Sequence, residues 1–187
     1  MVASHTFTQT HPLRHWLREG TVDLHDRLDA STDAAVLGDD MRYGQFLSAQ
    51  YRARQPIELW ANRHLDVDLR PPSVADLIAD DLRELDTAIP ATSAFELPTA
   101  FDALGVAWAI GGSSLGNKML LTRRRRSGAH HAERFLSDTS GMDYFRSLLP
   151  RLATPVSEGK AASAIRAAEA VFETFLAAVQ TPIRAVA

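Results

Sequence analysis

The sequence predicts an all-α, single-domain protein, and three observations support this prediction. Apolar residues recur at steps of three and four along almost the whole chain, which is the spacing of helices and not of strands. No Asn-Gly or Asp-Gly pair stands between alternating apolar runs, so no β-hairpin is indicated. With 187 residues, 45% of them hydrophobic, the chain is long enough to bury one substantial core. We expect one domain over residues 1–187, with residues 1–10 as a flexible tail.

The first two helices follow from apolar stripes. The first is expected over residues 11–30 with Pro12 in its first turn, and its stripe consists of Leu13, Trp16, Leu17, Thr21, Leu24 and Leu28. The second pattern covers residues 41–65 and contains Pro56. Because proline has no N–H and its ring clashes with the preceding turn, we expect a kink there or two abutting helices.

The rest of the chain continues in helices joined by short connections. Ser73 is a candidate N-cap for a short helix that ends near residue 85, and the proline-containing segment 87–99 is a connection. Further helices are expected over residues 100–126, 132–136, 142–149 and 157–180. The last of them is rich in alanine and has an apolar face of Ile165, Ala168, Phe172, Phe175, Leu176 and Val179.

Composition excludes several classes of function. Cysteine is absent, which removes disulfides, thiolate metal sites, iron–sulfur clusters and cysteine nucleophiles. The net charge of −3 does not indicate a nucleic-acid or membrane partner. The N-terminus lacks the pattern of a signal peptide, and the longest apolar run is far below the roughly 20 residues that cross a bilayer. We therefore expect a soluble, cytoplasmic protein.

Three glycines interrupt the long helical pattern in the segment WAIGGSSLGNKML, residues 108–120. In a helix each costs up to about 1 kcal/mol relative to alanine. Gly112 and Gly116 lie one turn apart, so their bare backbone can accept either a neighbouring helix or a flat ligand. The adjacent Gly111 favours a bend in the axis, and the hydroxyls of Ser113 and Ser114 can hydrogen-bond a ligand or water.

The first helix carries a candidate metal ligand. In the segment LREGTVDLHDRLDA, residues 17–30, helical spacing puts Arg18, Thr21, His25 and Leu28 on one face. Imidazole is a common iron ligand, so His25 is the leading axial candidate, and a satisfied boundary histidine is the alternative. A histidine and a cation on one helix, facing a bent glycine-rich helix, predict a site for a flat dianionic metal macrocycle, which is a haem site.

Both segments resemble motifs of the haem oxygenases. Residues 17–30 are similar to the first-helix motif Leu-Arg/Lys-x-Ala-Thr-x-x-x-His, with Gly20 at the alanine position. The segment GVAWAIGGSSLGNKML, residues 105–120, resembles the distal-helix motif in which Gly-x-x-x-Gly crosses over the haem. The segment YGQFLSAQYRARQPIE and the last helix resemble the bacterial branch, so the similarity covers the chain in order. It implies a helical bundle that holds haem between a proximal first helix and a kinked distal helix.

The resemblance assigns roles on the proximal side. His25 becomes the proximal iron ligand, and Arg18 the partner of a haem propionate, for which the planar guanidinium is suited. Thr21, the threonine of the motif, joins the haem-binding set.

On the distal side, the resemblance makes Gly112 and Gly116 the glycines whose backbone approaches the iron. Ser113 stands where mammalian members have an aspartate, and Asn117 where a second glycine often follows. With the two glycines these residues form the expected catalytic face. The two departures bear on rate and regiochemistry more than on the fold.

A basic run, Arg123 to Arg126, follows two to three turns after the glycines. Arg123 is the best candidate for the second propionate, or the run docks an acidic ferredoxin. The alternative is a solvated helix end whose cations complement the helix dipole. Arg166 on the last helix is a further propionate candidate, whereas the adjacent His130 and His131 are not expected to bind metal.

The resemblance implies an activity. Haem b is both substrate and oxygen-activating cofactor, and its oxidative cleavage with dioxygen yields biliverdin, carbon monoxide and ferrous iron. The chain has no flavin or nicotinamide fingerprint, so a ferredoxin or reductase must supply electrons, and a biliverdin acceptor is a second candidate partner. Two alternatives stay open, because one fold hosts several functions. They are a carrier or sensor of haem or another tetrapyrrole, and a helical protein with an unrelated small-molecule or partner site.

Overall fold

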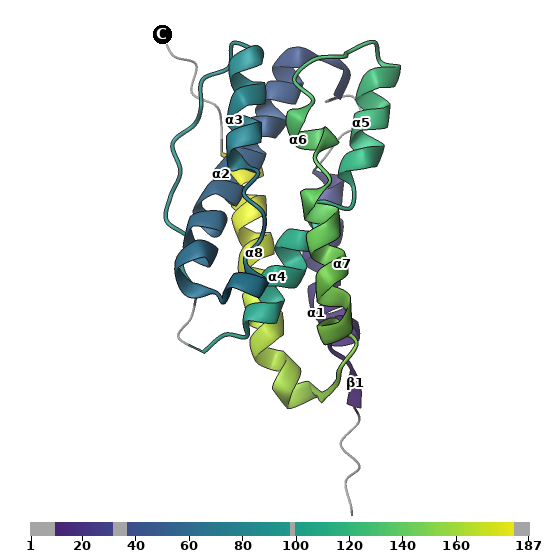
Figure 1. Ribbon diagram of the computed structural model, residues 1–187. Coiled ribbons are helices and arrows are strands. Elements are labelled where there is room, and N and C mark those ends of the chain that lie inside the picture. The colour runs from purple at the N-terminus through teal and green to yellow at the C-terminus, as the bar shows by residue number, and fades with distance from the viewer. Residues whose placement is uncertain (1–9, 32–36, 98–99, 182–187) are drawn as a thin grey trace, which may run out of the picture.

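The computed structural model describes residues 10–31, 37–97 and 100–181, and helices dominate these ranges (Figure 1). The helices are α1 (Leu13–Ala30), α2 (Asp40–His64), η2 (Val67–Leu69), α3 (Ala75–Glu84), α4 (Ala103–Gly112), α5 (Asn117–Arg126), α6 (Arg134–Ser137), α7 (Ser140–Leu152) and α8 (Glu158–Gln180). The all-α prediction is confirmed. One small addition is an antiparallel pair of short strands, β1 (Thr10–Pro12) and β2 (Pro155–Ser157). Of the expected tail, residues 1–9 lie outside the described ranges, and Thr10 begins β1.

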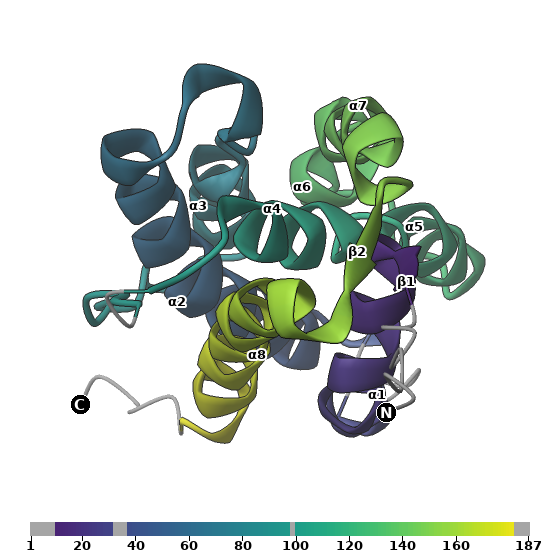
Figure 2. The same cartoon turned by 90° about the horizontal axis from the view of Figure 1, so that it is seen from below.

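Helix α8 is the centre of the main core, with α1, α2 and α4 packed around it (Figure 2). Its buried face is largely alanine, and small side chains let the neighbouring helices approach closely. Gly105 on α4 marks the closest approach, because a Cβ built there would lie 1.9 Å from the carbonyl oxygen of Ala164. Further along α8 the face widens to Phe172 and Phe175, as the sequence predicts.

A second cluster of buried apolar residues joins α2, α3 and α6. Buried carboxylates tie these helices together. Asp81 on α3 accepts hydrogen bonds from the backbone N–H groups of Arg134 and Phe135 at 3.1 and 2.9 Å, which holds the start of α6. Burial raises the pKa of Asp81, and these two donors, together with the Arg134 guanidinium at 3.1 Å, offset the cost of the buried carboxylate.

The start of α3 corrects a prediction. Ser73 does not cap the helix, since α3 begins two residues later, after Val74. The carboxylate of Glu58 on α2 instead accepts the backbone N–H groups of Val74 and Ala75, and also the Ser73 hydroxyl, all at 3.2 Å. A partner 16 residues away satisfies the helix end, which local spacing alone does not reveal.

The continuity of α2 and the start of α1 also differ from expectation. Helix α2 continues unbroken through Pro56, so the alternative of two abutting helices is wrong. Buried residues flank the proline on both sides, among them Ala53 and Ile57, and their packing maintains the helix despite the missing N–H. Helix α1 starts at Leu13 because Pro12 is extended and belongs to β1.

The long helix expected over residues 100–126 is two helices. Helix α4 ends at Gly112 and α5 begins at Asn117, with residues 113–116 in a turn between them, called the glycine turn below. The expected bend is therefore a complete break. No helix in the described ranges is long and apolar enough to cross a membrane.

Candidate ligand-binding site

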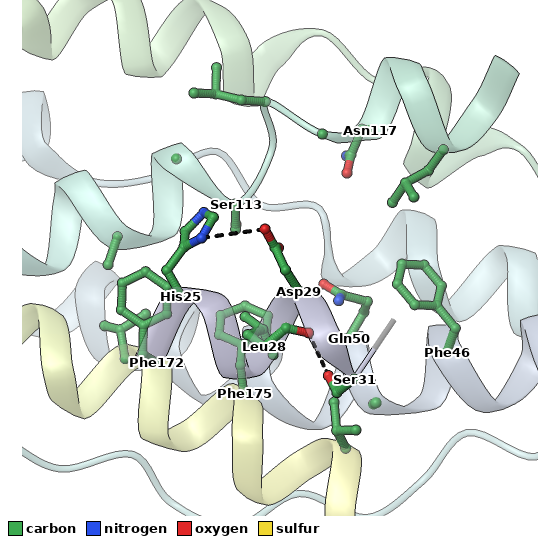
Figure 3. A pocket seen from close by; sticks show the side chains of 18 of the residues that line it. His25, Leu28, Asp29, Ser31, Phe46, Gln50, Ser113, Asn117, Phe172 and Phe175 are labelled. Carbon is green, nitrogen blue, oxygen red and sulfur yellow. Dashed lines mark hydrogen bonds and ion pairs between the residues drawn. The ribbon is translucent and has the colours of Figure 1, made fainter. Parts of the chain in front are cut away.

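A cavity of about 650 Å³ opens between α1, α2, the glycine turn and α8. Its size is in the range of small-molecule sites. The aromatic lining residues are Phe46, Trp108, Phe145, Phe172 and Phe175, and the polar ones are His25, Asp29, Ser31, Arg42, Gln45, Gln50, Ser113, Asn117 and Arg123. Figure 3 shows His25 and Asp29 rising from α1 toward the side where Ser113 and Asn117 lie. The walls therefore suit a flat apolar ligand with a few polar contacts.

Most of the predicted site residues line this one cavity. They come from α1, α4, the glycine turn and α5, and are His25, Gly112, Ser113, Gly116, Asn117 and Arg123. Tertiary packing thus brings together two segments that are about ninety residues apart in the chain.

Three predicted residues do not line the cavity. Arg18 and Arg166 are exposed side chains on α1 and α8. Thr21 is buried, and its hydroxyl donates to the carbonyl oxygen of Leu17 at 2.8 Å. The haem contacts expected of these three residues stay predictions.

His25 stands in the cavity wall with its side chain 56% exposed. Its Nδ1 lies 3.4 Å from a carboxylate oxygen of Asp29, one helical turn on, and 4.0 Å from one of Asp26. A carboxylate that holds Nδ1 fixes the ring and leaves Nε2 as the coordinating nitrogen. The ring also meets Phe172 edge-on at a centroid distance of 6.1 Å. Sequence reasoning missed Asp29, although its spacing of four from His25 was visible.

Gly112 and Gly116 are not explained by packing inside the protein. Among the described residues, a Cβ at Gly116 would meet nothing within 4 Å, and one at Gly112 would meet only the Phe145 ring at 3.9 Å. Gly116 has φ −78°, a value that any residue adopts. Both line the cavity, so their missing side chains leave room there.

Gly111 differs from the other two glycines of the segment. A Cβ at Gly111 would press on the rings of Tyr144 and Phe145 at 3.2 Å, so close packing against α7 accounts for this glycine. It lies inside α4, whereas the break comes after Gly112. The expected role of Gly111 as the point of the bend is therefore wrong.

The serine hydroxyls of the glycine turn are bound to a residue that sequence reasoning missed. Arg54 on α2 donates from one guanidinium nitrogen to Ser113 Oγ at 2.7 Å and to Ser114 Oγ at 3.0 Å. Ser113 in turn donates to the carbonyl oxygen of Ile110 at 2.7 Å. Arg54 is 2% exposed and pairs with Glu58 at 3.7 Å. Burial lowers the pKa of Arg54 and raises the pKa of Glu58.

Asn117 begins α5 and is 6% exposed. Its side-chain amide donates to the carbonyl oxygen of Phe135 at 3.5 Å, a long hydrogen bond. The side chain is therefore held at the cavity wall by α6, and Figure 3 shows it extending from the first turn of α5.

Two arginines line the cavity, and sequence reasoning found one of them. Arg123 lies on α5 and Arg42 on the first turn of α2. Among the described residues, neither guanidinium has an ion pair or hydrogen-bond partner. Both are thus available to carboxylates of a ligand. Arg42 had no sequence signal, because only the fold brings the start of α2 to this cavity.

The basic run is not a uniformly solvated helix end. Arg124 is 0% exposed, donates to the carbonyl oxygen of Leu37 at 3.0 Å and to Asp40 at 2.9 Å, and lies 3.8 Å from the centroid of the Tyr43 ring. Asp40 also contacts His131 at 3.0 Å. The expectation of a solvated end is wrong for Arg124, because α5 turns this side chain inward between α2 and the 127–133 segment.

Comparison with solved structures defines the class: the chain has an all-α, haem oxygenase-like fold. In particular, it is similar to the haem oxygenase of Neisseria meningitidis, whose crystal structures were described with NO and CO bound. The two share 19% sequence identity over 90% of each chain, with a TM-score of 0.70. No known family and no curated protein matches the chain by sequence. The similarity bears out the predicted fold.

Proposed function

We propose that the protein binds haem in this cavity and cleaves it oxidatively to biliverdin, carbon monoxide and ferrous iron. One observation carries the proposal. His25 and two glycines that packing does not require, Gly112 and Gly116, line the same cavity in a haem oxygenase-like fold. Glycines kept where a side chain would fit the protein are best explained by a ligand that needs the space.

The lining residues suit haem. His25, held at Nδ1 by Asp29, offers Nε2 to the iron. The rings of Phe172 and Phe175 supply apolar surface for the macrocycle. Arg42 and Arg123 bring two positive charges to the cavity, which matches the two propionates of haem.

The lining residues would have different roles in the binding and cleavage of haem. Bound haem supplies oxygen activation at its iron and is itself the substrate. A thiolate ligand would push electron density toward the iron and favour O–O cleavage, and an imidazole ligand at His25 does not. The bare backbone at Gly112 and Gly116 leaves volume for a small ligand and ordered water. Ser113 and Asn117 bring polar atoms to that side of the cavity. A ferredoxin or reductase supplies electrons from outside.

Turnover of added haem tests this proposal. The purified protein is mixed with ferric haem and then given a reductant in air, while the Soret band, bilin absorption and released carbon monoxide are followed. We expect the Soret band to form, then to decay as biliverdin and carbon monoxide appear. A Soret band that forms and persists without bilin identifies a haem carrier or sensor. A chain that never perturbs the haem spectrum has an unrelated site.

A further inference from the structure

Arg54 is buried against the glycine turn and does not itself line the cavity. We propose that Arg54 is a positioning residue, which fixes the glycine turn and sets the direction of the Ser113 hydroxyl at the cavity wall. The proposal rests on the proposed function only for the identity of the ligand in the cavity. The tie between Arg54 and the turn exists in the protein without a ligand.

The glycine turn depends on a contact from outside its own segment. Its backbone links are of the short i to i+3 type, such as Ser114 N–H to Gly111 at 3.2 Å and Leu115 N–H to Gly112 at 3.0 Å. Such links have poorer geometry than those of an α-helix. Arg54 adds two charge-assisted hydrogen bonds from a helix 59 residues earlier in the chain. It therefore anchors the turn to α2.

The anchor also sets the polarity of Ser113. The hydroxyl hydrogen of Ser113 points to the carbonyl oxygen of Ile110, and one lone pair of its oxygen accepts from Arg54. A hydroxyl has one hydrogen and two lone pairs, so the remaining lone pair can only accept. Ser113 thus presents an acceptor to a ligand or water in the cavity, and no donor.

The energetics of Arg54 support a role beyond stability. Among the residues that the structure describes, its Nε is buried without a hydrogen-bond partner, and Glu58 is the one carboxylate that pairs with the guanidinium. A buried ion pair is often no more stabilising than apolar residues of the same volume, and an unsatisfied donor adds a cost. Glu58 has partners of its own, the N–H groups of Val74 and Ala75. Beyond Glu58, the charge of Arg54 contacts the two serines of the glycine turn and the face of the Phe135 ring, 5.4 Å from its centroid.

Helix α7 confines the glycine turn on the side of Ser114 that faces away from Arg54. Ser114 is buried between Arg54 and α7, where a Cβ at Gly141 would lie 2.3 Å from Ser114 Oγ. The turn therefore cannot shift toward α7, and the position of Ser114 is set by Arg54 and the backbone of Gly141 together.

Amide hydrogen exchange in the haem-free protein tests the anchor. Arg54→Lys keeps the charge beside Glu58 but loses the terminal nitrogen that donates to both serines. We expect it to speed exchange at residues 113–117 by about tenfold, while the amides of α3 and α8 keep their rates. Arg52→Lys is the matched control, because Arg52 lies on the same helix but donates to Thr181. Unchanged rates at 113–117, or the same increase in every helix, would overturn the proposal.

A second set of variants separates the anchor from a general loss of stability. If Arg54 acts through the serines, Ser113→Ala with Ser114→Ala should also speed exchange at 113–117, and Arg54→Lys added to them should change little more. Additive increases would contradict the proposal.

In the haem-loaded protein, the stretching frequency of carbon monoxide on reduced haem serves as a probe of the field at the glycine turn. Arg54→Lys should shift it more than Arg52→Lys does, and equal frequencies would contradict the set polarity of Ser113. A protein that binds no haem refutes the proposed function, and exchange at 113–117 still decides the role of Arg54.

Discussion

At the scale of the residue, the pairing of His25 with Asp29 carries the first prediction. His25→Ala should abolish haem turnover, and added imidazole should restore part of it, because the small ligand can occupy the space of the lost ring. Asp29→Asn should weaken haem binding by about tenfold, since it removes the carboxylate 3.4 Å from Nδ1. Biliverdin formation measures the first effect, and spectroscopic titration with haem measures the second.

Asp26→Asn is the control for this pair. Asp26 carries the same charge on the same helix but lies 4.0 Å from Nδ1, so its loss should change haem affinity much less. Equal losses from both aspartates would mean that net charge near His25 matters and the orientation of the ring does not.

Gly116 gives the second prediction at this scale. The protein itself leaves open space at this Cβ, so Gly116→Leu should change the free energy of unfolding by less than about 1 kcal/mol while weakening haem binding by about tenfold or more. Gly111→Ala should show the reverse pattern: a lower free energy of unfolding with little change in haem affinity, because its Cβ would meet two aromatic rings at 3.2 Å. Urea unfolding and haem titration of both variants measure the contrast. Unweakened haem binding in Gly116→Leu would contradict a ligand seated over this backbone.

Residues with a local signal are the ones that the sequence predicted. His25 lies in one short motif, and Gly112 and Gly116 lie in another, so each motif can be found from its own local spacing. Arg42 and Arg54 belong to no such motif, and their roles depend on segments that the fold brings to them. Arg54, for example, meets Ser113 across 59 residues of chain. Spacing within a helix contains no information about such a partner.

At the scale of the element, periodicity located the helices well, and errors arose where long-range contacts decide. Pro56 is an example, because the buried residues on both sides hold α2 continuous. The cap of α3 is another, since Glu58 on α2 supplies what Ser73 was expected to supply. The break after Gly112 was anticipated as a bend, but its extent depends on the anchor to α2 and on α7.

The close contact of α4 with α8 provides a prediction for this scale. Gly105→Ala should lower the free energy of unfolding by about 3 kcal/mol, because its Cβ would lie 1.9 Å from a backbone oxygen of Ala164 and the two helices must separate. Gly159→Ala, in the first turn of α8 where no atom of the described part of the chain would lie within 4 Å of the new Cβ, should be neutral or slightly stabilising. Urea unfolding curves compare the two. A mild effect at Gly105 would show that α4 can move without cost.

At the scale of the whole molecule, the two apolar clusters meet along α2, which contributes to both. The cavity lies beside the same helix, which lines it with Arg42, Gln45, Phe46, Ala49 and Gln50, together with α1, the glycine turn and α8. Near one end of α2, Asp40 binds the buried Arg124 of α5. The charged contact therefore links the start of α2 to the helix that carries Arg123 into the cavity.

This link makes global stability depend on pH in a defined direction. The hydrogen bond from Arg124 lowers the pKa of Asp40 below its ordinary 3.8. A carboxyl whose folded pKa is lowered contributes stability that is complete above its unfolded pKa and lost as pH falls through the lowered folded value. Asp40→Asn should thus destabilise the protein by about 1 kcal/mol at pH 7, a modest figure because the Asp40 side chain is 53% exposed to screening water.

The difference in stability between Asp40→Asn and the unsubstituted protein should shrink below pH 4 and vanish as Asp40 becomes protonated in both the folded and the unfolded state. Urea midpoints between pH 7 and pH 3 measure it, with Asp143→Asn, which breaks a fully surface pair, as the control. A difference that persists at the lowest pH would mean that Asp40 acts through packing and not through its charge.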